Sequence, residues 1–196
     1  ALDETKNNYL MAVVYTGNNY GIATVDITTG DFFVTEVTSE RALLDEINKF
    51  TPSELVCNEA LFMSGLDMDE LKERYHFAVT ALENRFFSDD DCRKILKEHF
   101  HVMSLEGLGL GDYENGMIAS GAVLQYLYET QKNDLSHLTK ITPYTTGQFM
   151  MIDTSTRRNL ELVETLREKQ KRGSLLWVLD KTKTAMGARL LRSFIE

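Results

Sequence analysis

A glycine-rich segment, LEGLGLGDYENG at 105–116, is the first candidate for chemistry, because glycine-rich loops before helices bind nucleotide phosphates. A phosphate loop of the Walker type requires G-x-x-x-x-G-K-[ST], and no lysine or arginine occurs between Lys97 and Lys132. The glycine spacing also differs from the dinucleotide pattern G-x-G-x-x-G. The segment carries three carboxylates that would repel phosphate, those of Glu106, Asp112 and Glu114. We therefore predict a flexible linker that binds no nucleotide.

Carboxylates near the start of the chain suggest a second chemistry, hydrolysis of nucleic acid by two divalent metal ions. That reaction requires several carboxylates around two ions about 4 Å apart. Asp26 lies in the second predicted strand, and Asp31 and Glu36 lie at or beyond the next turn. The first predicted strand, YLMAVVYT at 9–16, contains no carboxylate. A metal-dependent nuclease remains the alternative to a non-catalytic domain.

Cysteine and histidine side chains lack the spacing of a metal site. Cys92 and His99 share a helical face seven residues apart, too far for one ion without a further ligand between them. We predict a hydrogen-bonded core histidine at 99 and a surface histidine at His101. Cys57 and Cys92 lie singly within apolar patterns, which favours buried free thiols and a reducing, cytoplasmic setting over a disulfide.

Charge is distributed unevenly along the chain. Residues 1–152 carry 11 lysines and arginines against 24 aspartates and glutamates, a net charge of −13. Residues 153–196 carry 10 against 6, a net charge of +4. The larger, acidic part would repel nucleic acid, so autonomous DNA binding is a hypothesis only for the basic tail. No apolar run approaches the ~20 residues that span a bilayer, and the polar start ALDETKNNYL shows no secretory signal, so we predict no membrane association.

A basic stripe interrupts the acidic part. Arg93, Lys94 and Lys97 fall on one predicted helix and would complement an acidic partner. The same residues are equally consistent with a solvated helix face that balances the three aspartates at 89–91.

The elements that position these residues predict an α/β domain. We expect strands over 9–16, 20–27, 32–38, 54–60 and 76–83. We expect helices after the N-caps Ser39, Asp67 and Ser88, and a longer helix over about 117–132 whose small residues approach the sheet closely. A three-stranded antiparallel meander followed by β-α-β-α units predicts one mixed sheet with helices on its faces, in the order of ribonuclease-H-like domains.

The last part of the chain has a helical pattern. GQFMMID at 147–153 predicts a connector or short strand, and helical periodicity follows, with a second helix around Leu190 and Leu191. These helices have too few partners within the segment to bury their apolar faces. We therefore predict a truncated all-α segment that opens a second domain.

Several stretches together resemble the bacterial MutS family of DNA mismatch-recognition proteins. The resemblance runs through YGIATVDITTGDF, PSELVCNEA and LGLGDYENGMIASGAVLQYLYETQK. The most specific parts are D-x-x-T-R-R-N-L-E at 153–161 and L-D-x-T-x-T-x-M-G-x-R-x-L at 179–191. Ala185 stands where many members have proline. The resemblance implies a ribonuclease-H-like connector domain over residues 1–150 and the first helices of the core, or lever, domain over 151–196.

The family's known parts imply a role without catalysis for this stretch. In the family a Phe-x-Glu motif in an N-terminal domain reads the mismatch, and the resemblance places this stretch after that domain. The sequence contains no Walker motif. ATP and Mg²⁺, like mismatched duplex DNA, would therefore be bound by other domains of a longer protein. The resemblance implies a cytoplasmic homodimer whose connector docks MutL. The MutL-facing helix matches the segment of Arg93, Lys94, Ile95 and Leu96.

Overall fold

A six-stranded mixed sheet forms the centre of the first of two units. The computed structural model describes residues 8–146, 183–184 and 189–192, and the chain divides into the units Ala1–Pro143 and Tyr144–Glu196. The strands of the sheet are β1 (Leu10–Thr16), β2 (Asn19–Val25), β3 (Phe32–Val37), β4 (Glu54–Cys57), β5 (Ala78–Ala81) and β6 (Thr142–Pro143). The helices are α1 (Glu40–Phe50), α2 (Met68–Tyr75), α3 (Asp89–Phe100) and α4 (Glu114–Thr130), with short 3₁₀ helices η1 (Glu59–Met63), η2 (Asn84–Phe87) and η3 (Leu105–Leu108).

The strand order is β5-β4-β1-β2-β3-β6. β1, β2 and β3 form the predicted antiparallel meander, and β4 and β5 add in parallel beside β1. The β1–β2 turn has positive φ angles of 58° at Gly17 and 67° at Asn18, as a two-residue turn matched to the strand twist requires. The mixed α/β architecture and all five predicted strands are thus confirmed, while the two-residue β6, parallel to β3, was not predicted.

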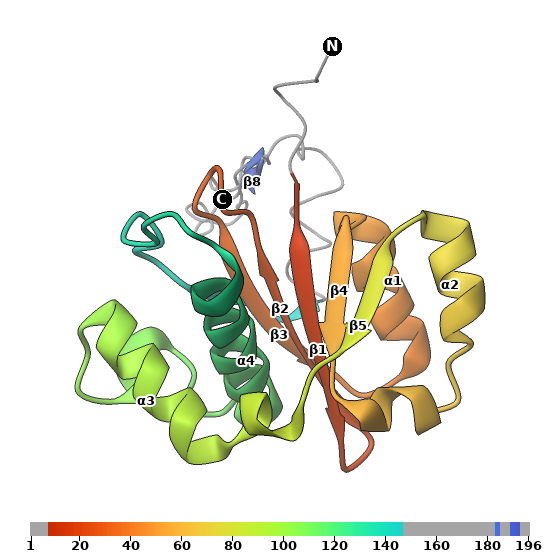
Figure 1. The fold of residues 1–196 in the computed structure, drawn as a ribbon, viewed down its shortest axis with the longest axis horizontal. Helices are drawn as coiled ribbons and strands as arrows, with labels where there is room; N and C mark the ends of the chain where they lie inside the picture. Colours follow the sequence, from red (N-terminus) through yellow and green to blue (C-terminus); the bar gives the residue numbers. More distant parts are fainter. Residues whose placement is uncertain (1–7, 147–182, 185–188, 193–196) are drawn as a thin grey trace. The chain divides into compact units, whose positions relative to one another are not determined.

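Helices cover both faces of this sheet. α1 and α2 lie on one face, and α3 and α4 lie on the other (Figure 1). Successive side chains along each strand point to opposite faces of the sheet. Ala12 and Ala23 belong to the core under α4, whereas Met11, Val13 and Ile22 are buried outside that cluster.

Three helices begin at the caps predicted from the sequence. The side chain of Ser39 accepts a hydrogen bond from the Ala42 amide at 3.1 Å, and that of Asp67 accepts one from the Glu70 amide at 3.1 Å. Ser88 caps α3 in the same way. The Glu70 carboxylate pairs with Arg74 at 2.6 Å.

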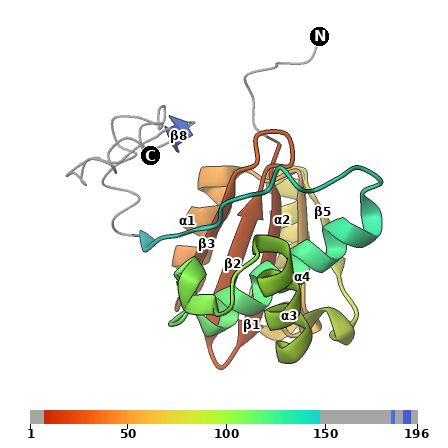
Figure 2. The same ribbon diagram turned by 90° about the vertical axis from the view of Figure 1, so that its left-hand side faces the viewer.

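α4 packs against α3 and against β2 of the sheet (Figure 2). A Cβ placed on Gly21 of β2 would lie 2.2 Å from the backbone carbonyl carbon of Asn115, at the start of α4. A Cβ placed on Gly121 would lie 2.3 Å from the Cβ of Cys92 in α3. The predicted close approach to the sheet is confirmed by Gly21, but Gly121 faces α3 and not the sheet. The position of Gly121 around the helix determines which neighbour it faces, and the small size of the residue does not reveal that position.

The second unit differs from prediction where the structure describes it. β7 (Lys183–Thr184) and β8 (Arg189–Arg192) pair antiparallel, with Lys183 opposite Arg192. The helix predicted around Leu190 and Leu191 is therefore wrong at these positions, because a short apolar run does not distinguish helix from strand by its period. The connector predicted over 147–153 and the helix expected before Gly173 lie outside the described residues.

Candidate protein-interaction site

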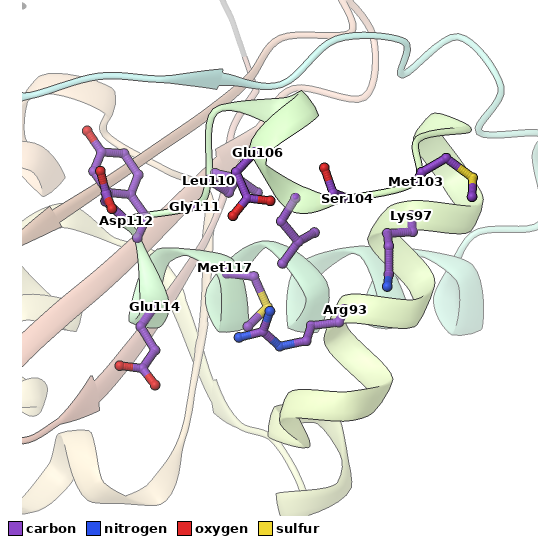
Figure 3. Close-up of a pocket in the computed structure, with 12 residues that line it drawn as sticks. Arg93, Lys97, Met103, Ser104, Glu106, Leu110, Gly111, Asp112, Glu114 and Met117 are labelled. Atoms are coloured by element: carbon purple, nitrogen blue, oxygen red, sulfur yellow. The ribbon is translucent and has the colours of Figure 1, made fainter.

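A surface groove of about 490 Å³ lies between α3, η3 and the start of α4 (Figure 3). The two segments that the sequence analysis treated separately, the basic stripe and the glycine-rich loop, form its walls. Side chains that line it include Arg93, Lys97, Met103, Glu106, Asp112 and Met117. α3 therefore contributes cations to one wall, and the loop contributes carboxylates to the other.

The glycine-rich loop has a hydrogen-bonded structure of its own. The amide of Gly107 donates to the Ser104 carbonyl at 3.2 Å, and the amide of Gly109 donates to the Glu106 carbonyl at 3.0 Å. Gly109 takes the left-handed conformation, with φ of 79°, that ends η3. The prediction of a flexible linker is wrong in this respect, because a 3₁₀ turn organises the segment.

The start of α4 already holds a carboxylate of the protein. The amide of Gly116 donates to Oε2 of Glu36 at 2.8 Å. A Cβ on Gly116 would lie 2.9 Å from the side chain of Val34, so glycine here lets the helix reach β3. The amides that a phosphate-binding loop would present are thus used within the protein at Gly107, Gly109 and Gly116.

The four predicted docking residues differ in how far the structure exposes them to solvent. Arg93 and Lys94 are exposed, Ile95 is partly buried, and Leu96 has no exposed surface. Leu96 belongs to the core under α4, so its predicted contact with a partner is incompatible with the packed position of α3. A helix turns by about 100° per residue, so four consecutive positions cannot share one surface.

Two further residues of the groove are a half-buried lysine and an exposed methionine. Lys97 lies one turn beyond Arg93, and both line the groove. Met103 follows the end of α3 and is 94% exposed, which is unusual for an apolar side chain. The sequence placed Lys97 in the basic stripe, but no pattern singled out Met103. Arg93 also pairs with Asp89 at the preceding turn of α3.

The histidine at 99 is hydrogen-bonded as predicted but only half-buried, and His101 is exposed as predicted. His99 uses both ring nitrogens: Nδ1 lies 2.6 Å from the Tyr128 hydroxyl, and Nε2 lies 2.8 Å from the Leu138 carbonyl oxygen. A carbonyl only accepts, so in the neutral ring Nε2 donates and Nδ1 accepts from Tyr128. Cys57 and Cys92 are buried free thiols, and burial raises the pKa of each to about 12. In residues 8–146 and the two short strands beyond, no group of three or more His, Cys, Asp or Glu side chains could hold a metal ion.

The carboxylate of Asp26, the leading residue of the nuclease alternative, organises a turn. It is only 1% exposed, and its Oδ1 accepts from the amides of Thr28 at 2.8 Å and Thr29 at 3.3 Å. Its Oδ2 accepts from the amide of Asn8 at 3.2 Å. The side chain thus ties the β2–β3 turn to the residues before β1.

We expect Asp26→Ala to lower the free energy of unfolding by about 2 kcal/mol, because three partly buried hydrogen bonds to this carboxylate are lost. Asp26→Asn keeps one oxygen and should cost about half as much. Urea denaturation of both variants measures this, with Asp31→Asn as the matched control, expected within about 0.5 kcal/mol of the parent. The nuclease alternative would be favoured by a different pair of results. Asp26→Ala would be as stable as the parent, and it would lack a Mg²⁺-dependent nucleic-acid cleavage that the parent chain shows.

The fold and the groove define a class of protein, an α/β module with a surface groove between a basic and an acidic wall. Residues 8–139 match the family described as MutS domain II, and residues 155–196 match MutS domain III. The chain belongs to the MutS family.

Its relatives include proteins named DNA mismatch repair protein MutS from three bacteria. The whole chain aligns at 65% identity with the protein of Lachnoclostridium phytofermentans, 49% with that of Ruminiclostridium cellulolyticum and 46% with that of Acetivibrio thermocellus. The aligned region covers 21%, 22% and 22% of those proteins, so the chain spans about a fifth of their length. Among the described residues, no helix combines the length and apolar character that crossing a membrane requires.

Proposed function

We propose that this chain is a non-catalytic connector of a DNA mismatch repair ATPase and that it docks MutL through the groove. In this assignment residues 1–150 form the connector domain, with a ribonuclease-H-like fold, and residues 151–196 open the core domain. The antiparallel meander followed by parallel β4 and β5 supports that fold. ATP with Mg²⁺ and mismatched DNA would be bound by other domains of a longer, homodimeric protein.

The observation that carries the docking proposal is that the exposed Arg93, the half-buried Lys97 and the exposed Met103 line one groove. Cations beside an accessible apolar side chain suit a protein partner, because charge guides the encounter and apolar contact slows dissociation. The net charge of −13 over residues 1–152 makes nucleic acid an unsuitable ligand for the same surface. Lys94 lies beside this groove on the exposed side of α3.

The test is a double charge reversal, Arg93→Glu with Lys94→Glu, in the 196-residue chain and in the full-length protein. We expect the affinity for labelled MutL to fall at least about tenfold, because reversing two rim charges replaces attraction with repulsion. Fluorescence anisotropy at two salt concentrations measures the affinity, and the difference between parent and variant should shrink at high salt.

The matched control reverses two exposed cations on the other face of the sheet, Arg41→Glu in α1 with Lys72→Glu in α2. This control changes the net charge equally and should leave the affinity for MutL within about twofold of the parent. An equal loss in both double variants would mean that net charge, and not the groove, determines binding. Unchanged binding in the Arg93 and Lys94 variant would remove these positions from the interface.

A further inference from the structure

The outermost strand, β5, has one edge that no other strand of the described residues covers (Figure 1). Its inner side pairs in parallel with β4 along all four residues. The amides of Ala78 and Leu82 donate to carbonyl groups on that inner side at 3.3 and 2.8 Å. Backbone groups alternate in direction along a strand, so the N–H and C=O groups of Val79 and Ala81 point outward.

This edge strand is short, at four residues, but it lacks the other features that normally prevent strand pairing. Its sequence is AVTA, with no lysine, no proline and an unbroken register to β4. Ala78, Thr80 and Ala81 are exposed, and none of these side chains is large enough to shield the backbone. The opposite edge differs, because β6 is two residues long and ends in Pro143, which has no N–H to donate.

The charges around β5 indicate what would pair there. Cations close to the strand in sequence are already paired: Lys72 with Asp69 at 3.5 Å and Arg74 with Glu70 at 2.6 Å. Arg85 is held by two carboxylates, those of Glu83 at 2.8 Å and Glu129 at 2.7 Å. Glu83 and Glu129 together carry two negative charges against the one positive charge of Arg85. The edge is therefore flanked by excess negative charge.

We propose that the open edge of β5 binds an extended segment of a partner protein that has a small, uncharged core flanked by lysine or arginine. The backbone of Val79 and Ala81 would supply the hydrogen bonds, as when a peptide adds a strand to a sheet. The flanking carboxylates would select a basic segment over an acidic one. This surface is separate from the groove, which lies between α3, η3 and α4.

A second copy of this chain is the less suitable occupant. Pairing two copies at β5 would bring together two acidic units, each carrying −13 over residues 1–152. Repulsion between two acidic units disfavours their association, whereas a basic segment would be attracted to the same edge.

The test uses two synthetic peptides and the isotope-labelled 196-residue chain. Both peptides have a Val-Thr-Val-Thr core, one with two lysines and the other with two glutamates at each end. We expect NMR shifts and slowed hydrogen exchange at the amides of Val79 and Ala81 with the lysine peptide, and at least about tenfold weaker binding of the glutamate peptide.

Ala81→Pro removes an outward N–H without removing a bond to β4, so it should abolish binding of the lysine peptide, whereas Ala81→Ser should retain it. A lysine peptide with N-methylated core amides gives the same test without altering the protein, in case the proline variant misfolds. Equal binding of both peptides, shifts confined to other residues, or full binding by a folded Ala81→Pro variant would overturn the proposal. Concentration-dependent shifts at Val79 and Ala81 without peptide would also overturn it, in favour of a second copy.

Discussion

Replacing Gly21 with alanine should destabilise the first unit by about 3 kcal/mol and lower its thermal midpoint by about 10 °C. Strand propensity alone predicts the opposite sign, because glycine is a poor strand residue. Packing outweighs propensity here: the new Cβ would lie 2.2 Å from both the carbonyl carbon and oxygen of Asn115 and 2.6 Å from the amide nitrogen of Gly116. These are backbone atoms, so no side-chain rotation relieves the overlap. Calorimetry or circular dichroism of the variant measures the loss.

The matched control is Gly107→Ala in the glycine-rich loop. A Cβ at this position would meet the side chain of Val102 at 3.7 Å, an ordinary contact. We expect the control to be neutral or slightly stabilising, because alanine restricts the unfolded chain more than glycine does. If Gly21→Ala were as stable as Gly107→Ala, the start of α4 would not lie against β2 as described.

The close contact at Gly21 also affects the β1–β2 hairpin. Nδ2 of Asn115 donates to the carbonyl oxygens of Thr16 at 3.2 Å and Asn19 at 3.4 Å, so α4 holds the end of β1 and the start of β2. Moving α4 away from Gly21 would break these bonds together. We therefore expect the loss in Gly21→Ala to appear as a single cooperative shift and not as local fraying.

Local features of the fold were predictable because short stretches of sequence determine them. Ser39, Asp67 and Ser88 each precede a helical period, and a side-chain oxygen at such a position satisfies a free amide of the first turn. The turn at Gly17 and Asn18 follows from residues that tolerate positive φ. Neither inference requires knowledge of distant parts of the chain.

The groove was not predictable because its walls meet only through tertiary packing. The sequence located the basic stripe and the glycine-rich loop, but their separation depends on how closely α3 approaches α4. The family resemblance assigned Leu96 to an interface, whereas the packing of α3 on α4 buries it in the core. Likewise, the spacing of Gly107, Gly109 and Gly116 does not reveal that their amides are used internally.

The contact between Gly121 and Cys92 sets the distance between α3 and α4, and Gly121→Ala should therefore disturb both stability and the groove. Alanine is the better helix former by about 1 kcal/mol. The added Cβ, however, would lie 2.3 Å from the Cβ and 2.6 Å from the Cα of Cys92. We expect a net loss of about 3 kcal/mol in urea denaturation, with MutL affinity reduced because Arg93 and Lys97 move with α3.

A double-mutant cycle with Cys92→Gly distinguishes this packing cause from a general weakening. Cys92→Gly removes two of the three overlapping atoms, the Cβ at 2.3 Å and the Sγ at 2.8 Å, but leaves the Cα at 2.6 Å. Relief should therefore be partial, with an interaction energy of about 1 kcal/mol. Cys92→Ala keeps the Cβ at 2.3 Å and removes only the sulfur at 2.8 Å, which donates to the Phe86 carbonyl at 3.3 Å, so it should give less relief than Cys92→Gly. Strict additivity in the glycine pair would show that these two residues do not set the spacing of the helices. Relief in the alanine pair as large as in the glycine pair would assign the clash to the sulfur atom.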